Sequence, residues 1–452
     1  MKRTNLFFLK SLILFSSLFF IKQDFLAQNN WYFKNSNKKF ERVKFKLINN
    51  LIVLPLKING NVQNFILDTG VSKTILFNIV EKDSINLNNY EKVNLFGLGK
   101  GEPVVALASK NNQISLKKIV GEKQTVFVIL KNSFDLSSKM GITINGIIGY
   151  TLLRNFRVKI NYKSKYMDFY PANDDRFKVC KKCEVFPIEF FRRKPFIDIK
   201  VQLDTVGNKL TDTKVLIDSG GSDALWLFEN TKSEIKTPKN FFRDLLGEGL
   251  SGLIYGNRSR LPKIKLNSFE IKSPTASFLD SLSTKNARVF KKRNGSIGAN
   301  ILKRFTVWLD YQNNMLILKK NGFYNDAFDY NMSGLEVVYN GKQLVKQETE
   351  TMYIDSYNQN VNPNSSLQFL TNYTYKFKPS YKIKSVLPNS PGEAAGLETG
   401  DVILRINNKA AHEYRLSEIA QKFQEKDGKK IRLIIERNGK RLKFQFKLKK
   451  KV

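Results

Sequence analysis

The chain has 452 residues, which exceeds what one ordinary hydrophobic core serves, so we expect two or three domains. Hydrophobic residues make up 42% and aromatic residues 12%, enough to bury sizeable cores and to exclude global disorder. The formal net charge is +36, but the lysines are spread along the chain and no nucleic-acid-binding motif accompanies them. We therefore expect solvated basic surfaces in preference to a polyanion site, and no nucleic-acid partner.

The first residues, 1–27, have the features of a secretory signal peptide. Two basic residues precede an apolar stretch over 6–21, which is shorter than the roughly 20 uninterrupted apolar residues of a membrane-spanning helix. We expect cleavage near Ala27 and a secreted or periplasmic protein with no membrane span in the mature chain. Phe25 is a poor cleavage residue, so an uncleaved segment that anchors the protein in a membrane is the alternative.

Histidine and cysteine are scarce, and this excludes several hydrolytic mechanisms. His412 is the single histidine, whereas Ser-His-Asp, Cys-His and His-Glu-x-x-His chemistry all need one near the reacting group. Cys180 and Cys183 form a Cys-x-x-Cys pair without a thioredoxin-like context or further zinc ligands, so we expect either a disulfide or two free thiols. We expect no metal and no cofactor, which leaves proton transfer to carboxylates, lysines or hydroxyls.

Two carboxylates occupy the same special setting. Asp68 and Asp218 each end an apolar, strand-like run and begin an Asp-Thr/Ser-Gly tripeptide. The glycine permits a tight turn that exposes the carboxylate at the end of the strand. Average residue usage predicts roughly 0.2 such tripeptides in a chain of this length. Two of them, both after strand signals, indicate a functional pair.

The segments downstream of the two motifs repeat as well. Residues 145–162 follow Asp68 at nearly the same distance as residues 295–311 follow Asp218. Both contain an apolar-Gly motif followed by a short helical signal. Self-similarity at a matched offset indicates a repeated structural unit.

Paired Asp-Thr/Ser-Gly turns with later apolar-Gly segments resemble the pepsin and retropepsin superfamily of aspartic peptidases. The resemblance implies a mainly β fold with two pseudo-symmetric retropepsin-like β-barrel lobes, the bilobal acid-protease fold, over residues 41–172 and 184–320. Each lobe would supply one aspartate. Two adjacent carboxyls cannot both ionise readily, so they share a proton and can activate a water for attack on a peptide bond.

The resemblance also implies roles for residues around the pair. The Thr69 and Ser219 hydroxyls would hydrogen-bond across the lobe interface, and Ser72 and Ser222 would orient the outer carboxylate oxygens. Gly221 departs from the small side chain usual in the family. The candidate site comprises catalytic Asp68 and Asp218; supporting Thr69, Gly70, Ser72, Ser219, Gly220 and Ser222; and bracing Ile148, Gly149, Ile297 and Gly298.

Each lobe also carries a glycine-rich segment between its aspartate and its apolar-Gly motif. Such segments are typical of hairpin tips, and in the family such hairpins are flaps that close over an extended substrate. Our flap candidates are Gly99 in the first lobe and Gly249 with Tyr255 in the second. Ordinary surface hairpins, with a structural tyrosine, are the alternative.

Residues 381–408 closely resemble bacterial-type PDZ domains and predict a PDZ-like, partly open β-barrel with helices over 330–450. PDZ domains bind peptides by strand addition. Candidates for the peptide-binding loop are Ser333, Gly334, Leu335 and Glu336, although that glycine has a structural explanation too. The stretch between this loop and Tyr381 is predicted to be an insertion.

The leading hypothesis is an aspartic endopeptidase that cleaves polypeptide substrates, with a PDZ domain that binds substrate or a peptide or protein partner. The alternative is a catalytically inactive, peptidase-like binding or scaffold protein that recognises peptides through its PDZ domain. The intact tripeptides around both aspartates favour the enzyme.

Overall fold

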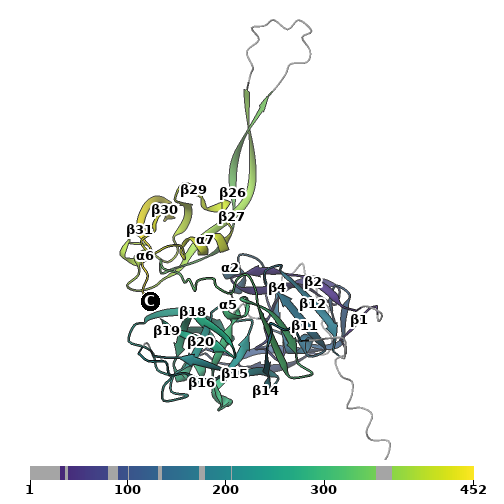
Figure 1. Ribbon diagram of the computed structural model, residues 1–452. Coiled ribbons are helices and arrows are strands. Elements are labelled where there is room, and N and C mark those ends of the chain that lie inside the picture. Colours follow the sequence, from purple (N-terminus) through teal and green to yellow (C-terminus); the bar gives the residue numbers. More distant parts are fainter. Residues whose placement is uncertain are drawn as a thin grey trace, which may run out of the picture.

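The computed structural model describes residues 31–35, 39–79, 90–99, 101–130, 135–172, 179–204, 206–352 and 369–452. The expected signal peptide, residues 1–27, lies outside the described residues. Within them the chain is mainly β: two large lobes lie side by side, and a smaller domain above them carries a long projecting hairpin (Figure 1). This confirms the predicted fold class. None of the helices in these ranges is long and apolar enough to cross a membrane.

Lobe 1 is built on a nine-stranded sheet with the order β1-β9-β6-β10-β5-β4-β8-β7, in which β3 pairs with β4. The β4–β5 hairpin closes through Asn59 and Gly60, both with left-handed backbone angles, as a two-residue hairpin turn requires. The sheet begins at Trp31, before the predicted start of the lobe at residue 41. Its strands are β1 Trp31–Phe33, β3 Lys46–Ile48, β4 Leu51–Ile58, β5 Asn61–Leu67, β6 Thr74–Leu76, β7 Tyr90–Leu95, β8 Val104–Leu116, β9 Ile119–Val128 and β10 Gly146–Ile148, and its helices are α2 Leu136–Met140 and α3 Tyr150–Leu153.

Lobe 2 repeats this plan on a ten-stranded sheet with the order β18-β19-β22-β17-β23-β16-β15-β20-β21, in which β14 pairs with β15. Its strands are β14 Glu189–Phe191, β15 Lys194–Gln202, β16 Thr211–Asp218, β17 Leu225–Phe228, β18 Phe242–Gly249, β19 Gly252–Arg260, β20 Lys263–Leu266, β21 Phe269–Lys272, β22 Thr275–Leu279 and β23 Arg293–Gly298. Its helices are α4 Ser281–Thr284, the 3₁₀ helix η1 Ala287–Val289 and α5 Ala299–Leu302.

A third, six-stranded sheet is shared by the two lobes and runs β13-β25-β24-β11-β12-β2. The lobes join where β11 pairs antiparallel with β24, and the buried Arg157 Nε donates to Asp310 Oδ2 across this seam at 2.6 Å. Because one sheet crosses both halves, they form one continuous hydrophobic core. Its strands are β2 Glu41–Lys44, β11 Phe156–Asn161, β12 Tyr166–Pro171, β13 Glu184–Pro187, β24 Phe305–Asp310 and β25 Met315–Lys320.

The C-terminal domain has its own core and a six-stranded sheet, with the path β26-β27-β28-β30-β31 and β29 paired to β28. The predicted insertion forms the distal part of the β26–β27 hairpin, which projects away from the lobes (Figure 1). Its strands are β26 Leu335–Met352, β27 Phe369–Val386, β28 Val402–Ile406, β29 Lys409–Ala410, β30 Lys430–Arg437 and β31 Lys440–Lys447, with helices α6 Pro391–Ala394, η2 Ala411–Glu413 and α7 Leu416–Lys422.

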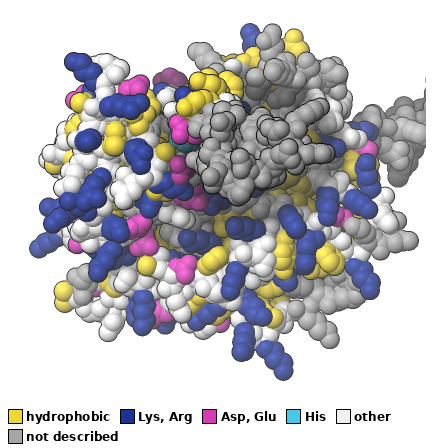
Figure 2. Space-filling model, turned by 90° about the horizontal axis from the view of Figure 1, so that it is seen from above, with side chains coloured by type: hydrophobic (Ala, Val, Ile, Leu, Met, Phe, Trp, Pro, Cys, Tyr) yellow, Lys and Arg dark blue, Asp and Glu magenta, His cyan; other side chains and the backbone are white. Residues whose placement is uncertain are grey.

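Surface charge and the two cysteines follow the sequence pattern. On the face shown in Figure 2, Lys and Arg side chains are spread over the surface and acidic side chains lie between them.

Cys180 and Cys183, in the segment that connects the two lobes, are joined in a disulfide, which decides between the two states that the sequence leaves open.

Candidate active site

Two strand ends bring Asp68 and Asp218 together at the centre of the two-lobed body. Asp68 follows β5 directly and Asp218 is the last residue of β16. A Cβ built on Gly70 would lie 3.1 Å from Asp68 Oδ1 and 3.5 Å from Asp218 Oδ1, and one built on Gly220 would overlap the Asp68 carboxyl. Both carboxyls therefore converge on the same small space. That space leaves no room for a side chain at positions 70 and 220, so both are glycine.

A symmetric set of hydrogen bonds locks the two loops together behind the carboxyls. Thr69 Oγ1 donates to the Ile217 carbonyl at 2.6 Å and accepts from the Ser219 N–H at 2.9 Å. Ser219 Oγ donates to the Leu67 carbonyl at 2.8 Å and accepts from the Thr69 N–H at 3.1 Å. Both hydroxyls are buried, so every donor and acceptor in this set has a partner away from water. These are the cross-lobe contacts that the family resemblance implies.

The carboxylates are held mainly by backbone N–H groups. Gly70 N–H donates to Asp68 Oδ1 at 2.7 Å, and Gly221 N–H donates to Asp218 Oδ1 at 2.9 Å. No hydrogen bond joins the Ser72 or Ser222 hydroxyl to either carboxylate within the described ranges, although the resemblance implies one for each. A Cβ on Gly221 would lie 3.3 Å from the Asp218 carboxyl, which is a tight contact. Glycine therefore fits this position without displacing the carboxyl.

The apolar-Gly motifs lie directly behind the two loops, and their strands β10 and β23 run parallel to the strands that lead to the aspartates. The Ile148 carbonyl accepts from the Asp68 N–H at 2.8 Å. A Cβ on Gly149 would collide with the Asp68 carbonyl and lie 2.6 Å from the Val71 carbonyl oxygen. Gly298, which follows Ile297 in β23, packs in the same way against the second loop. A Cβ built on it would lie 2.7 Å from the Gly221 carbonyl oxygen.

The two glycine-rich segments meet each other. The lobe 1 loop after β7 contacts the turn of the β18–β19 hairpin, which we call the flap hairpin: Gly101 N–H donates to the Ser251 carbonyl at 2.6 Å, and Ser251 N–H donates to the Leu98 carbonyl at 3.0 Å. Gly99 and Gly249 are both in this contact, where a Cβ on either would strike the opposite backbone. Tyr255 instead lies on the exposed side of the flap hairpin, and the Arg243 guanidinium lies 5.9 Å from its ring.

Burial dominates the electrostatics of the aspartate pair. Loss of solvation, together with the neighbouring charge of Asp218, raises the pKa of Asp68 to about 7. Loss of solvation raises the pKa of Asp218 as well. Two cations oppose the rise: Lys194 acts on both carboxyls and Arg293 acts on Asp218. The coupled pair therefore holds a proton at a pH where an ordinary aspartate is ionised.

Sequence reasoning missed three residues near the pair. Lys194 begins β15, and continuing the β15–β16 register by two residues places it opposite Asp218. The Arg293 guanidinium is buried and hydrogen-bonds the Gly295 carbonyl and Ser296 Oγ, and its burial lowers its pKa to about 10. Tyr311 is buried without a hydrogen bond to its hydroxyl in the described chain, and burial together with the charge of Asp68 raises its pKa.

A comparison of the two halves would have singled out two of them. The β4–β5 register, continued in the same way, places Leu51 opposite Asp68, where lobe 2 has Lys194. Ile144 stands five residues before Gly149, and Arg293 stands five residues before Gly298. Each cation of lobe 2 thus replaces an aliphatic residue of lobe 1.

The predicted peptide-binding loop of the C-terminal domain starts its edge strand, β26. Ser333 is buried and its hydroxyl accepts from the Leu335 N–H at 3.1 Å, while Leu335 packs into the domain core. Gly334 has a left-handed backbone (φ +77°) and no room for a side chain beside Ser390. Glu336 Oε2 accepts from Ser385 Oγ at 2.9 Å. Both α7 and α2 pack against this edge strand.

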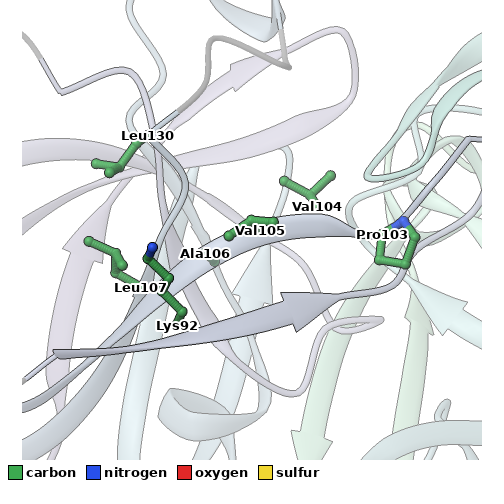
Figure 3. Close-up of a pocket in the computed structure, with 7 residues that line it drawn as sticks. All are labelled: Lys92, Pro103, Val104, Val105, Ala106, Leu107 and Leu130. Carbon is green, nitrogen blue, oxygen red and sulfur yellow. The ribbon is translucent and has the colours of Figure 1, made fainter.

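A shallow groove lies apart from the aspartates, along β8 (Figure 3). Its volume is about 400 Å³ and its lining is mostly apolar. It is formed by Lys92, Pro103, Val104, Val105, Ala106, Leu107 and Leu130. Neither Asp68 nor Asp218 is among the residues that line this groove.

Two parts of the chain match known protein families. Residues 54–152, which include Asp68, match the family model described as aspartyl protease, and residues 382–437 match the model of the PDZ domain. The solved structure of an aspartic proteinase from Irpex lacteus is similar at 14% identity and a TM-score of 0.43, covering 64% of this chain and 99% of that chain. No curated protein matches the chain. The chain is therefore similar to aspartyl proteases in lobe 1 and to PDZ domains near its C-terminal end.

Proposed function

We propose that the protein is an aspartic endopeptidase whose catalytic pair is Asp68 and Asp218. The observation that carries the proposal is the convergence of the two carboxyls within one symmetric hydrogen-bond set, made by Thr69 and Ser219. Two carboxyls that converge on one largely enclosed space share one proton, so one acts as base while the other acts as acid.

The chemistry follows from this protonation state. The ionised carboxylate takes a proton from a water held between the two groups, and the resulting hydroxide attacks the peptide carbonyl carbon. The protonated carboxyl donates its proton to the developing oxyanion. As the C–N bond breaks, the first carboxyl gives its proton to the leaving amine, and a hydroxyl of the collapsing intermediate returns a proton to the second carboxyl, so protons balance over the cycle. An extended polypeptide would lie beneath the flap hairpin and the lobe 1 loop, which exclude bulk water.

We further propose that the PDZ domain binds a peptide end or extended segment along the outer edge of β26, the last strand of its sheet. The protein would act outside the cytoplasm, as residues 1–27 suggest. The Cys180–Cys183 disulfide supports this location, because disulfides persist in oxidising compartments. Cell fractionation with an antibody to the protein tests the location, and recovery in the cytosol would contradict it.

Cleavage of fluorescently labelled, unfolded casein between pH 3 and pH 8 tests the enzymatic proposal. Asp68→Asn and Asp218→Asn should each lower kcat/KM by at least about 10³-fold, because each removes one half of the acid–base pair. Asp212→Asn is the matched control: it lies on the same strand, β16, with its side chain 71% exposed, and should leave activity unchanged. Equal cleavage by wild type and both active-site variants would refute the assignment.

A further inference from the structure

A lysine of lobe 1 connects the flap hairpin of lobe 2 to the PDZ domain. Lys139 lies on α2, and its Nζ is 3.3 Å from Glu248 Oε2 and 3.2 Å from Glu336 Oε1. The three side chains are only 17%, 13% and 24% exposed. Solvent screens charges this far from water only weakly. The attraction between the lysine and each glutamate is therefore strong, and loss of one charge leaves its partner poorly compensated.

Glu248 is the flap's contribution to this triad. It is the penultimate residue of β18, next to the turn whose Ser251 contacts the lobe 1 loop. Glu248 Oε2 is buried and accepts no hydrogen bond within the described chain, so the nearby Lys139 ammonium compensates its charge. Without Lys139 this carboxylate would be buried unpaired, and the flap hairpin would relieve that cost by moving out toward water.

Glu336 is the contribution of the PDZ domain. It is the second residue of the edge strand β26, and α2 packs against this strand (Figure 1). Gly141 ends α2, and a Cβ built on it would lie 3.0 Å from the Cβ of Leu416, the first residue of α7. The end of α2 therefore lies against both elements that border the expected peptide site, β26 and α7.

The other end of the same flap strand also contacts the PDZ domain. Phe242 begins β18, its ring centroid is 5.2 Å from that of Tyr330, and the Lys451 ammonium lies 5.3 Å from the Phe242 ring. The flap strand thus contacts the PDZ domain directly at its base and through Lys139 near its tip.

From these contacts we propose that Lys139 is a positioning residue that holds the flap hairpin closed, and that the PDZ domain governs opening of the cleft through it. The proposal rests on the proposed peptidase function, since it assigns regulation to that same cleft. A peptide that adds to the outer edge of β26 would compete with α2 for the same strand, weaken both ion pairs of Lys139, and so open the flap.

Ion-pair variants of the full chain test the coupling without a known ligand. Lys139→Met removes both contacts, and Glu336→Gln removes only the one on the PDZ domain, far from the aspartates. Lys384→Met is the matched control: it breaks another interdomain ion pair, to Asp135 Oδ2 at 3.3 Å, which does not touch the flap hairpin. Kinetics on labelled unfolded casein and hydrogen exchange over residues 242–255 are measured for each variant.

We expect Lys139→Met and Glu336→Gln to lower KM by about three- to tenfold with kcat within about twofold, because a larger open fraction raises apparent affinity. The double variant should match Lys139→Met alone. Hydrogen exchange of the flap hairpin should accelerate in the same variants and not in Lys384→Met. The coupling would be overturned if the Glu336→Gln variant had the KM and hydrogen exchange of the wild type, or if KM rose in either variant. An equal effect of Lys384→Met would overturn it as well. If wild type cleaves nothing, the peptidase proposal fails, and hydrogen exchange still decides the coupling.

Discussion

Replacing Asp68 by Asn should stabilise the two-lobed body at pH 8 and change its stability little at pH 4. Burial and the charge of Asp218 raise the pKa of Asp68 from its ordinary 3.8 to about 7. Folding therefore favours the protonated form, so the associated stability is fully present below about pH 4 and is lost as the pH rises through about 7. About three pKa units at 1.36 kcal/mol each set a ceiling of about 4 kcal/mol. By solvent accessibility the Asp68 residue is only half-buried, and this partial exposure lowers the expected gain to about 1–2 kcal/mol.

Urea unfolding followed by tryptophan fluorescence measures this difference cleanly. The three tryptophans, Trp31, Trp226 and Trp308, all lie in the two-lobed body, so the signal does not report on the PDZ domain. Asp212→Asn makes the same chemical change at an exposed position and should give no gain that depends on pH. Equal stability changes for Asp68→Asn at pH 4 and pH 8, or a loss at pH 8, would refute the reasoning.

Three other substitutions test the remaining contacts of the site. Lys194→Leu should shift the basic limb of the kcat/KM profile up by about one pH unit, because loss of a nearby cation raises the pKa of the pair; an unmoved limb would contradict this. Thr69→Ala leaves the buried Ser219 N–H without an acceptor and should lower the free energy of unfolding by about 2–3 kcal/mol in urea titrations, whereas Thr69→Ser should cost less than about 1 kcal/mol. Gly149→Ala would force a Cβ into the backbone behind Asp68 and should cost more than about 3 kcal/mol and abolish cleavage; near-wild-type unfolding would show that the loop can move.

The sequence predicted those structural features that depend on residues close together in the chain. An apolar run that ends in Asp-Thr/Ser-Gly specifies a strand, a tight turn and an exposed carboxylate, and two copies indicate a pair. The repeat then predicted two similar lobes, and the two-lobed β fold is confirmed. The PDZ motif was equally local, since its helix cap at Ser390 and the turn at Gly400 occur within a dozen residues.

Contacts between distant segments could not be predicted in this way. Nothing in β11 or β24 alone shows that they pair with each other across the lobes, because both are ordinary amphipathic strands. Lys139 is one of 76 basic residues, and the two glutamates that it joins are far from it in sequence. Its role depends on three domains meeting at one point, which only the folded chain shows.

The departure from symmetry at the aspartate pair has a physical consequence. If two identical chains formed such a pair, each carboxyl would face the same neighbours, and any preference for one proton position would have to come from the substrate. Here lobe 2 has the buried Arg293 where lobe 1 has Ile144, and the charge of Arg293 acts on Asp218, whereas the charge of Lys194 acts on both carboxyls. In the proposed catalytic pair, the charge of Arg293 would favour ionisation of Asp218 and leave the shared proton closer to Asp68. A tandem arrangement of the lobes thus allows the two carboxyls to differ before any substrate binds.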